Sequence, residues 1–192
     1  DFHRFIDSLE MNTLTEKLAW EFNQYHPMDH RRISFITSMV FIETKVKSKE
    51  TMYLTYDELH QLFDNNMLFV EPQLNGQFLK FCDNNGSIDE TVYSATVHAF
   101  AHWTYFRTAK RMMVVDLQGV FDPLKGGYAL TDPAIHHDFK SKFFFTWSSD
   151  GKNGIEKFFA THKCNEVCKN LGLENQQKVP DGQEFAGTIL LR

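Results

Sequence analysis

The stretch RMMVVDLQGV, residues 111–120, decides how the rest of the chain is interpreted. Its apolar half predicts a short buried strand, and the strand ends in the polar residues Asp116 and Gln118. Because side chains alternate along a strand, these two are expected on the same side, where they can share a hard cation or orient a substrate hydroxyl. Asp132, in the LTDP that follows, could supply a second carboxylate. Aspartates beside loops are also frequent turn formers, so a purely structural role stays open.

A second group of reactive side chains lies in THKCNEVCKN, residues 161–170. Cys164 and Cys168 are four positions apart, so on a helix both sulfurs can reach one ion. His162 cannot share that face and must come from a break or turn before the last helical turn. Zinc binds four nitrogen or sulfur ligands, and three are present here. Two buried free cysteines without a metal are the alternative, whereas a redox pair is disfavoured because C-x-x-C is absent.

The missing fourth ligand is expected from a helix that precedes the RMMVV strand. Apolar residues recur about every four positions through residues 92–103, which predicts a helix capped by Ser87 or Asp89. His98 and His102 fall on one face of this helix, and either can donate an imidazole nitrogen to a zinc ion.

Two further helices are predicted at the ends of the sequence. Thr13 and Glu16 form a capping-box pattern at the start of a helix expected over about residues 14–25. The last helical region begins near Gly154, and Gly172 offers a stop at its carboxyl end.

Segments rich in β-branched and aromatic residues predict strands of one mainly antiparallel sheet. These segments cover residues 33–46, 52–56 and 67–71. Residues 77–83 alternate only imperfectly and end in DNNGS, a turn signal. The stretch 121–142 contains proline and glycine breaks and is predicted to be irregular. In WSSDGKNG, residues 147–154, two glycines precede a helix and could present backbone N–H groups to an anion. The order of the elements indicates an α+β architecture.

The composition favours a packed core and excludes some classes of partner. Of the 192 residues 42% are hydrophobic, which is enough for one substantial core. The formal net charge of −5 gives no electrostatic basis for binding nucleic acid or an anionic membrane. No apolar run approaches the ~20 residues of a membrane span, and three cysteines fit a reducing compartment. We therefore expect a cytoplasmic chain with no membrane insertion.

Taken together, these segments resemble the catalytic domain of the alpha-kinases, atypical protein kinases that include the myosin heavy chain kinases, the elongation-factor kinase and the channel-kinases. The resemblance runs through LAWEFNQY, FVEPQLNGQFLKFCDNNG, HAFAHWTYFRTAKRMMVVDLQGV, LTDPAIH and FFATHKCNEVCKNLGL, in the family's order. DLQGV, then TDP, then HxCNxxC is highly specific as a set. It implies an atypical protein-kinase-like fold with a zinc-containing C-lobe, a kinase domain over residues 1–173 and a tail over 174–192.

The resemblance implies an ATP-dependent serine/threonine protein kinase that uses magnesium and acts on a protein substrate. Asp116 would be the catalytic carboxylate that orients or deprotonates the substrate hydroxyl, while Gln118 and Asp132 would hold magnesium against the ATP phosphates. Glu71 and Leu74, in FVEPQL, would line the adenine site mainly through backbone groups. Without the resemblance, these last two residues would be interpreted as a strand end.

The resemblance also implies the fourth zinc ligand. The family places a histidine on the helix ahead of the DLQGV strand, and the matching residue here is His102. His162, Cys164 and Cys168 complete the set, so the zinc is expected to be structural and to hold the last helix against the magnesium-bearing lobe. His98, one turn earlier, is a second choice that could instead be a core histidine.

Departures from the family pattern bear on activity. FDPLKGGYA, residues 121–129, separates Asp116 from Asp132, although a looped-out insertion would leave Asp132 in place because longer loops cost only modest closure entropy. The family's glycine-rich loop is reduced to DGKNG. The nucleotide-binding strands and the ATP-anchoring lysine would precede the first helix, and Lys17 lies inside that helix. We therefore expect an incomplete N-lobe, poor ATP binding, and slow or absent phosphate transfer.

These departures keep a second class of function open. A zinc-stabilised pseudokinase or binding module would retain the fold and the zinc, and would use the altered loops to bind another protein or a small ligand. The sequence upstream of Asp1 discriminates between the two, because a glycine-containing strand pair with a lysine supports a kinase. A zinc-finger-like nucleic-acid binder is disfavoured by the net charge and by the lack of a basic stripe.

Overall fold

The computed structural model describes five stretches of the chain, residues 2–25, 31–42, 67–88, 94–137 and 149–173. Some predictions fall wholly or partly outside these residues: the strand at 52–56, the end of the strand at 33–46, the cap Asp89, the start of the 147–154 loop and the tail 174–192.

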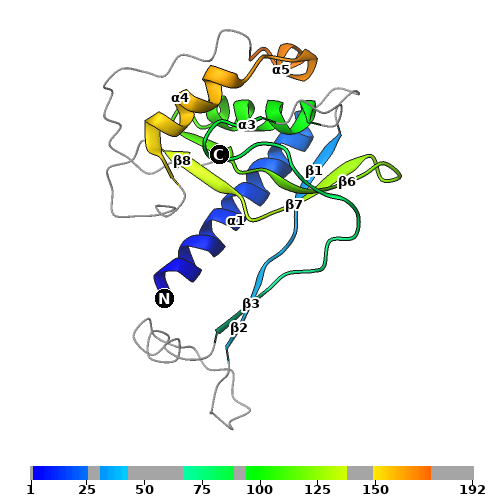
Figure 1. Cartoon of the computed structure of the whole chain (residues 1–192), viewed down its shortest axis with the longest axis vertical. Coiled ribbons are helices and arrows are strands. Elements are labelled where there is room, and N and C mark those ends of the chain that lie inside the picture. Colours follow the sequence, from blue (N-terminus) through cyan, green and yellow to red (C-terminus); the bar gives the residue numbers. More distant parts are fainter. Residues whose placement is uncertain (1, 26–30, 43–66, 89–93, 138–148, 174–192) are drawn as a thin grey trace.

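The described residues form four helices and eight strands. The helices are α1 (Phe2–Gln24), α3 (Ala95–Arg107), α4 (Gly151–Thr161) and α5 (Glu166–Asn170). The strands are β1 (Arg32–Phe35), β2 (Met39–Ile42), β3 (Met67–Val70), β4 (Phe78–Lys80), β5 (Met112–Val115), β6 (Gln118–Asp122), β7 (Gly127–Thr131) and β8 (Ala134–His137). Figure 1 shows α3, α4 and α5 together at one end, and the β2–β3 ribbon extending away from the rest.

The strands form three separate sheets, so the prediction of a single sheet is wrong. The largest has the order β1-β7-β6-β4, and the two others are the pairs β2–β3 and β5–β8. All ladders are antiparallel except β1–β7, in which Arg32 pairs with Gly127 in parallel register. The sheets are separate because the chain turns sharply where one strand follows another. Residues 36–38 break the predicted strand 33–46, and Asp116 with Leu117 separates β5 from β6.

The prediction that residues 121–142 are irregular is wrong for the part that the structure describes. The breakers Pro123 and Gly126 are confined to the turn of a hairpin between β6 and β7. The missed signal is the alternation along β7, where Tyr128 and Leu130 are buried and their neighbours are not. In β6, Gly119 has a φ of 151°, and a Cβ there would collide with a backbone carbonyl of β7.

Helix α1 begins well before the predicted start near residue 14. Thr13 is therefore not an N-cap but an interior residue, and its hydroxyl donates to the Leu9 carbonyl at 2.7 Å. At the other end, Asn23 closes the free edge of β1, because its side chain both accepts from the Ile33 N–H and donates to the Ile33 carbonyl.

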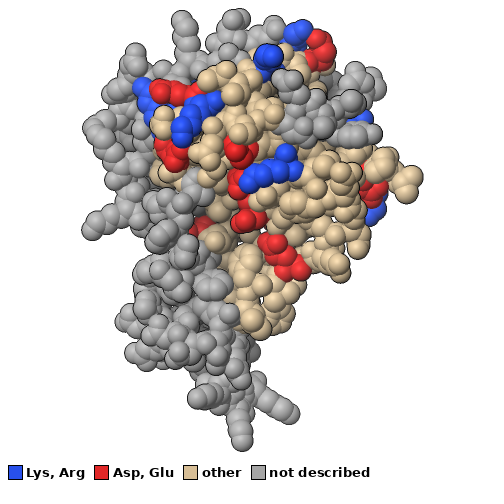
Figure 2. Space-filling view, viewed as in Figure 1, with Lys and Arg blue, Asp and Glu red and all other residues tan. Residues whose placement is uncertain are grey.

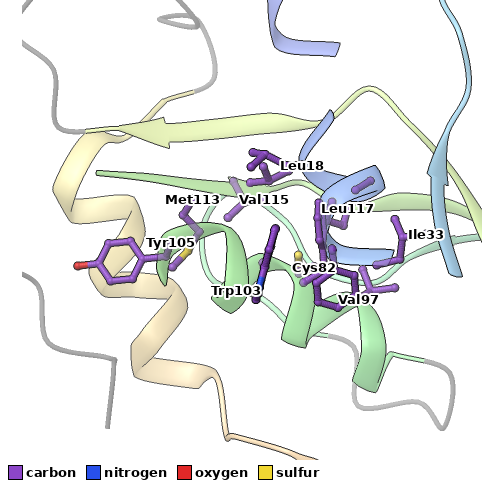
Figure 3. Packing of buried hydrophobic residues seen from close by; sticks show 14 of the residues in the cluster. Leu18, Ile33, Cys82, Val97, Trp103, Tyr105, Met113, Val115 and Leu117 are labelled. Atoms are coloured by element: carbon purple, nitrogen blue, oxygen red, sulfur yellow. The ribbon is translucent and has the colours of Figure 1, made fainter. Parts of the chain in front are cut away.

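Helix α3 is the centre of the hydrophobic core. Ten of its residues are buried, and its aromatic side chains pack edge-to-face on α1, with Phe22 5.2 Å from Phe100 and 5.4 Å from Trp103 between ring centroids. Figure 3 shows side chains of α3, β5 and α1 meeting in this core, with Tyr105 directed toward α4. The ring of Tyr105 reaches Phe159 of α4 at 5.2 Å.

Two buried threonines attach α3 to β5, the strand that leads into DLQGV. The Thr104 hydroxyl accepts from the Val114 N–H at 3.0 Å and donates to the Ala101 carbonyl at 2.7 Å. The Thr108 hydroxyl accepts from the Met112 N–H at 3.1 Å. These hydroxyls satisfy the edge of β5 that does not pair with β8, so helix and strand are held in a fixed relation.

Among the described residues, no helix has the length and apolar character needed to cross a membrane.

Candidate functional site

The DLQGV aspartate lies at a sharp change of chain direction. Asp116 has a φ of 55°, between β5 and β6, so the expectation that it continues a strand and shares a side with Gln118 by alternation is wrong. This left-handed conformation is uncommon for residues other than glycine and marks a place where strain is stored. The turn directs the chain from one sheet into another and leaves the Asp116 carboxylate mostly buried.

A lysine that the sequence analysis did not single out pairs with this aspartate. Lys80, at the end of β4, places its Nζ 2.6 Å from Oδ1 of Asp116. The ion pair raises the pKa of Lys80, whose side chain is half exposed. Nothing in the pattern of FLKF indicates this contact, because it depends on the pairing of β4 with β6, in which Lys80 is opposite Gln118.

The hairpin brings the third predicted residue to the same place. Gln118 pairs with Thr131, the last residue of β7, and its Nε2 lies 3.4 Å from the backbone oxygen of Asp132. Burial raises the pKa of Asp132, and the negative charges of Asp116 and Glu71 raise it further. Asp132 also has a left-handed φ, of 46°. We call Asp116, Gln118, Asp132, Glu71 and Lys80 the carboxylate cluster.

Glu71 and Leu74 follow β3, where the ribbon returns toward the main sheet. Leu74 is half buried. The Glu71 carboxylate does not point freely into solvent: Ser38 Oγ donates to its Oε1 and Thr131 Oγ1 donates to its Oε2, both at 2.7 Å. The sequence indicated a role for this residue mainly through its backbone, and no local pattern pointed to these side-chain bonds.

The four predicted zinc ligands come together in a second site. One ligand atom from each of His102, His162, Cys164 and Cys168 lies within 4.8 Å of all the others. Cys164 Sγ is 3.7 Å from His102 Nδ1, and Cys168 Sγ is 3.6 Å from His162 Nε2. Ordinary Zn–N and Zn–S lengths at a tetrahedral angle separate nitrogen from sulfur by about 3.6 Å. We call these four residues the His–Cys cluster.

The local chain conformation explains how residues so close in sequence converge. Helix α4 ends at His162, whose φ of −66° and ψ of 123° are extended, so the predicted break before the cysteines is confirmed. Helix α5 then presents Cys168 inward. Its N-cap Asn165 accepts from the N–H groups of Val167 and Cys168 and donates to the Ala95 carbonyl at 2.8 Å. Asn165 therefore ties α5 to α3 and was missed as a positioning residue, although it is part of HxCNxxC.

Burial sets the charge state of the His–Cys cluster. It lowers the pKa of His102 to about 4 and that of His162 to about 3. The neighbouring His102 and His98 lower the pKa of His162 further. It raises the pKa of the Cys168 thiol to about 12. Neutral imidazole is the form that binds a metal ion, whereas a buried thiolate needs the positive charge of such an ion beside it.

His98 has a different role from that of the His–Cys cluster. Its Nε2 lies 2.8 Å from the carbonyl oxygen of Phe81, and the residue is buried. It is thus a hydrogen-bonded core histidine, as the alternative reading of the sequence allowed.

The DGKNG stretch packs around another buried histidine, and its two glycines lie in the first turn of α4 rather than before the helix, so that part of the prediction is wrong. His136 of β8 accepts from the Asp150 N–H through Nδ1 at 3.1 Å, and its Nε2 lies 2.9 Å from the Asn84 carbonyl. A Cβ at Gly154 would collide with this ring, so the glycine is needed for packing. Burial lowers the pKa of His136.

Charges on the surface are mixed. In Figure 2 the acidic and basic side chains of the described residues lie in small adjacent groups on the face that is drawn.

An α+β kinase-like fold that carries a carboxylate cluster and a His–Cys cluster defines an atypical kinase domain. The sequence model of the alpha-kinase family matches residues 1–168, and the chain belongs to this family.

Curated relatives of this chain are protein kinases. Alpha-protein kinase vwkA of Dictyostelium discoideum is 35% identical over 172 residues, which are 88% of this chain and 24% of that kinase. Eukaryotic elongation factor 2 kinase of Caenorhabditis elegans is 28% identical over 175 residues, or 91% of this chain and 19% of that kinase. The chain therefore spans a quarter or less of the length of these relatives.

Solved structures agree with this assignment. An alpha kinase from Entamoeba histolytica superimposes with a TM-score of 0.82 at 33% identity, covering 96% of this chain and 69% of that one. The alpha-kinase domain of myosin-II heavy chain kinase A in complex with AMP-PNP superimposes with a TM-score of 0.67 at 31% identity, covering 92% and 58%.

Proposed function

We propose that this chain is part of an ATP-dependent serine/threonine protein kinase and that the carboxylate cluster is its catalytic site. The observation that carries the proposal is the convergence of Asp116, Lys80 and Asp132 onto one place from three separate segments: the turn after β5, the end of β4 and the turn after β7. Family membership supports the reaction class, since the relatives are protein kinases and a related domain binds AMP-PNP.

In the proposed reaction Asp116 orients the hydroxyl of a serine or threonine on a protein substrate and receives its proton. The hydroxyl oxygen forms a bond to the γ-phosphorus of ATP, the bond from that phosphorus to the β,γ-bridging oxygen breaks, and ADP leaves. Lys80 holds the Asp116 carboxylate in place through the 2.6 Å ion pair. The contribution of the protein is therefore positioning and electrostatic stabilisation.

The donor atoms near Asp132 suit magnesium, which prefers oxygen ligands. Asp132 and the side-chain oxygen of Gln118 would hold the ion, which supplies positive charge to the ATP phosphates when bound. The raised pKa of Asp132, caused by burial and by Asp116 and Glu71, supports this assignment because a nearby cation would relieve both effects. The backbone groups of Glu71 and Leu74 would contact the adenine.

The His–Cys cluster would hold a structural zinc ion. Two neutral buried imidazoles and two cysteines at tetrahedral spacing fit zinc in number and type of ligand. All four positions belong to the protein, so the site has no open position for catalysis. The ion would join α3, the end of α4 and α5, the three segments that carry its ligands.

The insertion between DLQGV and TDP is less of an obstacle to this function than the sequence suggests. Its residues lengthen both arms of the β6–β7 hairpin, and the register still pairs Gln118 with Thr131 beside Asp132. A pseudokinase or binding module, the alternative function, therefore gains no support from a displaced Asp132.

The deciding experiment measures transfer of the ATP γ-phosphate to a protein substrate by the natural protein that contains residues 1–192. Asp116→Ala is expected to abolish transfer, because loss of a general base alone costs about 10²–10⁴-fold. Glu156→Gln, an exposed carboxylate on α4, is the matched control and should retain activity. Equal activity in both variants would contradict the assignment. Tight ATP binding without transfer in the unaltered protein would favour the pseudokinase.

A further inference from the structure

The Glu71 carboxylate is the centre of a polar network that connects four segments of the chain. Its Oε1 accepts from Ser38 Oγ and its Oε2 accepts from Thr131 Oγ1, both at 2.7 Å. Ser38 Oγ in turn accepts from Asn12 Nδ2 at 2.8 Å. The network thus links α1, the turn between β1 and β2, the end of β3 and the end of β7.

The position of Thr131 gives this network its significance. Thr131 pairs with Gln118 in the hairpin and is bonded directly to Asp132, whose left-handed backbone is unfavourable for a residue with a side chain. Such a conformation persists only when neighbouring contacts hold it in place. The bond from the Thr131 hydroxyl to Glu71 fixes the residue immediately before it.

The same carboxylate also places a negative charge near Asp132. Two hydroxyl donors compensate for its partial burial, one on each oxygen, so the carboxylate need not pair with a cation to be stable there. Its charge acts on Asp132. In many metal sites, residues that do not touch the ion orient those that do. A carboxylate held by hydroxyls beside a cation-binding residue is suited to this role.

We propose that the Glu71 side chain is a positioning residue that holds Asp132, through Thr131, in a fixed place relative to the end of β3. Glu71 acts through its neighbours and need not touch a reacting atom. The inference rests on the proposed function in that it takes Asp132 as a cation-binding residue. It adds that the segment expected to contact adenine and the segment expected to bind the cation are joined by one carboxylate.

The test combines a structural readout with a cation-binding readout. Hydrogen exchange of the backbone N–H groups of residues 131, 132, 134 and 135 reports whether this segment is held; residue 133 is proline and has no N–H. Binding of Mn²⁺, with and without AMP-PNP, is followed by electron paramagnetic resonance in the Asp116→Ala background, in which turnover cannot interfere. Both measurements use the natural full-length protein.

Four variants separate position from charge. Glu71→Ala and Thr131→Val each remove the bond, and each should weaken Mn²⁺ affinity by roughly tenfold or more and accelerate exchange at 131–135. Thr131→Ser keeps the hydroxyl and should behave as the unaltered protein. Glu71→Gln can still bond to both hydroxyls but lacks the charge, so it should keep slow exchange while weakening Mn²⁺ binding. The double variant Glu71→Ala/Thr131→Val should be no worse than Glu71→Ala alone, because both changes remove the same bond.

Two outcomes would overturn the inference. One is unchanged exchange and unchanged Mn²⁺ affinity in Glu71→Ala, equal to those of the exposed control Glu156→Gln. The other is additive effects of Glu71→Ala and Thr131→Val. Failure of the proposed function looks different: Asp132→Ala would then leave Mn²⁺ affinity unchanged, whereas the exchange data on Glu71→Ala would still decide whether the carboxylate holds this segment.

Discussion

The His–Cys cluster and the carboxylate cluster are built in opposite ways. In the first, three of the four side chains lie within seven residues of the chain. The end of α4 and the N-cap of α5 bring these three together with ordinary backbone angles. In the second, the side chains come from strands and strand ends far apart in sequence, and both aspartates have left-handed backbones. The first site depends on local geometry, whereas the second depends on sheet pairing and must hold strained residues in place.

The two clusters also differ in how deeply they are buried, and this difference suits them to different roles. A buried group of nitrogen and sulfur atoms is stable without hydration if it binds a cation, so it suits a structural role. In the proposed function the carboxylate cluster has to admit substrates, and its Lys80 is half exposed. Changes to the first cluster should therefore act mainly on stability, and changes to the second mainly on rate.

Cys168→Ala should give the largest effect and is expected to act on stability. Loss of a ligand to structural zinc is expected to cost on the order of 5 kcal/mol or more, given apparent binding energies of about 10–16 kcal/mol in small zinc domains. Elemental analysis should show loss of one zinc per chain, and thermal unfolding should move to lower temperature. The matched control is Cys82→Ala, a buried cysteine outside the cluster, which should keep its zinc. Equal zinc content in the two variants would contradict the site.

Lys80→Met is expected to act on rate. Without the ammonium, Asp116 loses the partner that holds it, and a displacement of about 1 Å can lower a rate roughly 10²-fold. Because the Lys80 side chain is half exposed, solvent screens the ion pair and urea unfolding should change little. Phosphate transfer by Lys125→Met, at the exposed hairpin turn, provides the comparison. A rate for Lys80→Met equal to that of this variant would remove Lys80 from the carboxylate cluster.

Thr104→Val tests the connection between the two clusters, since α3 carries His102 and β5 leads to Asp116. The valine leaves the Val114 N–H buried without its acceptor, which should cost about 1–3 kcal/mol in urea unfolding. Thr104→Ser retains the hydroxyl and should recover most of this loss. If valine and serine are equally stable, the hydroxyl does not hold helix and strand together.

His136→Asn should give the smallest effect and depends on pH. Burial lowers the pKa of His136, so the unfolded chain binds a proton more readily than the folded one does. The associated stability is complete above the ordinary histidine pKa near 6.5 and declines as pH falls below it, by at most about 1.4 kcal/mol per pH unit. Asp150, Lys157 and His137 face the same ring and are retained in the variant.

The measurement for this last variant is unfolding in urea at pH 7.5 and at pH 5.5. The unaltered protein should lose more stability between these two values than His136→Asn does. Identical losses would assign all acid sensitivity to other groups.

Much of the His–Cys cluster could be predicted from sequence. The four-residue spacing of Cys164 and Cys168 and the need for a break at His162 follow from helix geometry. The choice between His98 and His102 did not follow from spacing, because both lie on one face of the same helix. The fold resolves this choice, since Nε2 of His98 is hydrogen-bonded to the carbonyl oxygen of Phe81.

Less of the carboxylate cluster could be predicted from the sequence. The motif indicated Asp116, Gln118 and Asp132, but the assumed continuous strand was wrong and the hairpin was taken for an irregular loop. A breaker-rich stretch can belong to a turn of a few residues with strong strands on either side. The alternation of Tyr128 and Leu130 was the signal that could have revealed it.

The sequence by itself determined that helices form in these regions, that an apolar strand precedes DLQGV and which chemical types of side chain lie at both sites, because these depend on spacing along the chain. It did not give the early start of α1. Only the tertiary structure decided that Lys80 pairs with Asp116 and that Glu71 reaches Thr131 across sixty positions. Such contacts depend on which strands pair and in what register, and no local pattern specifies either of these.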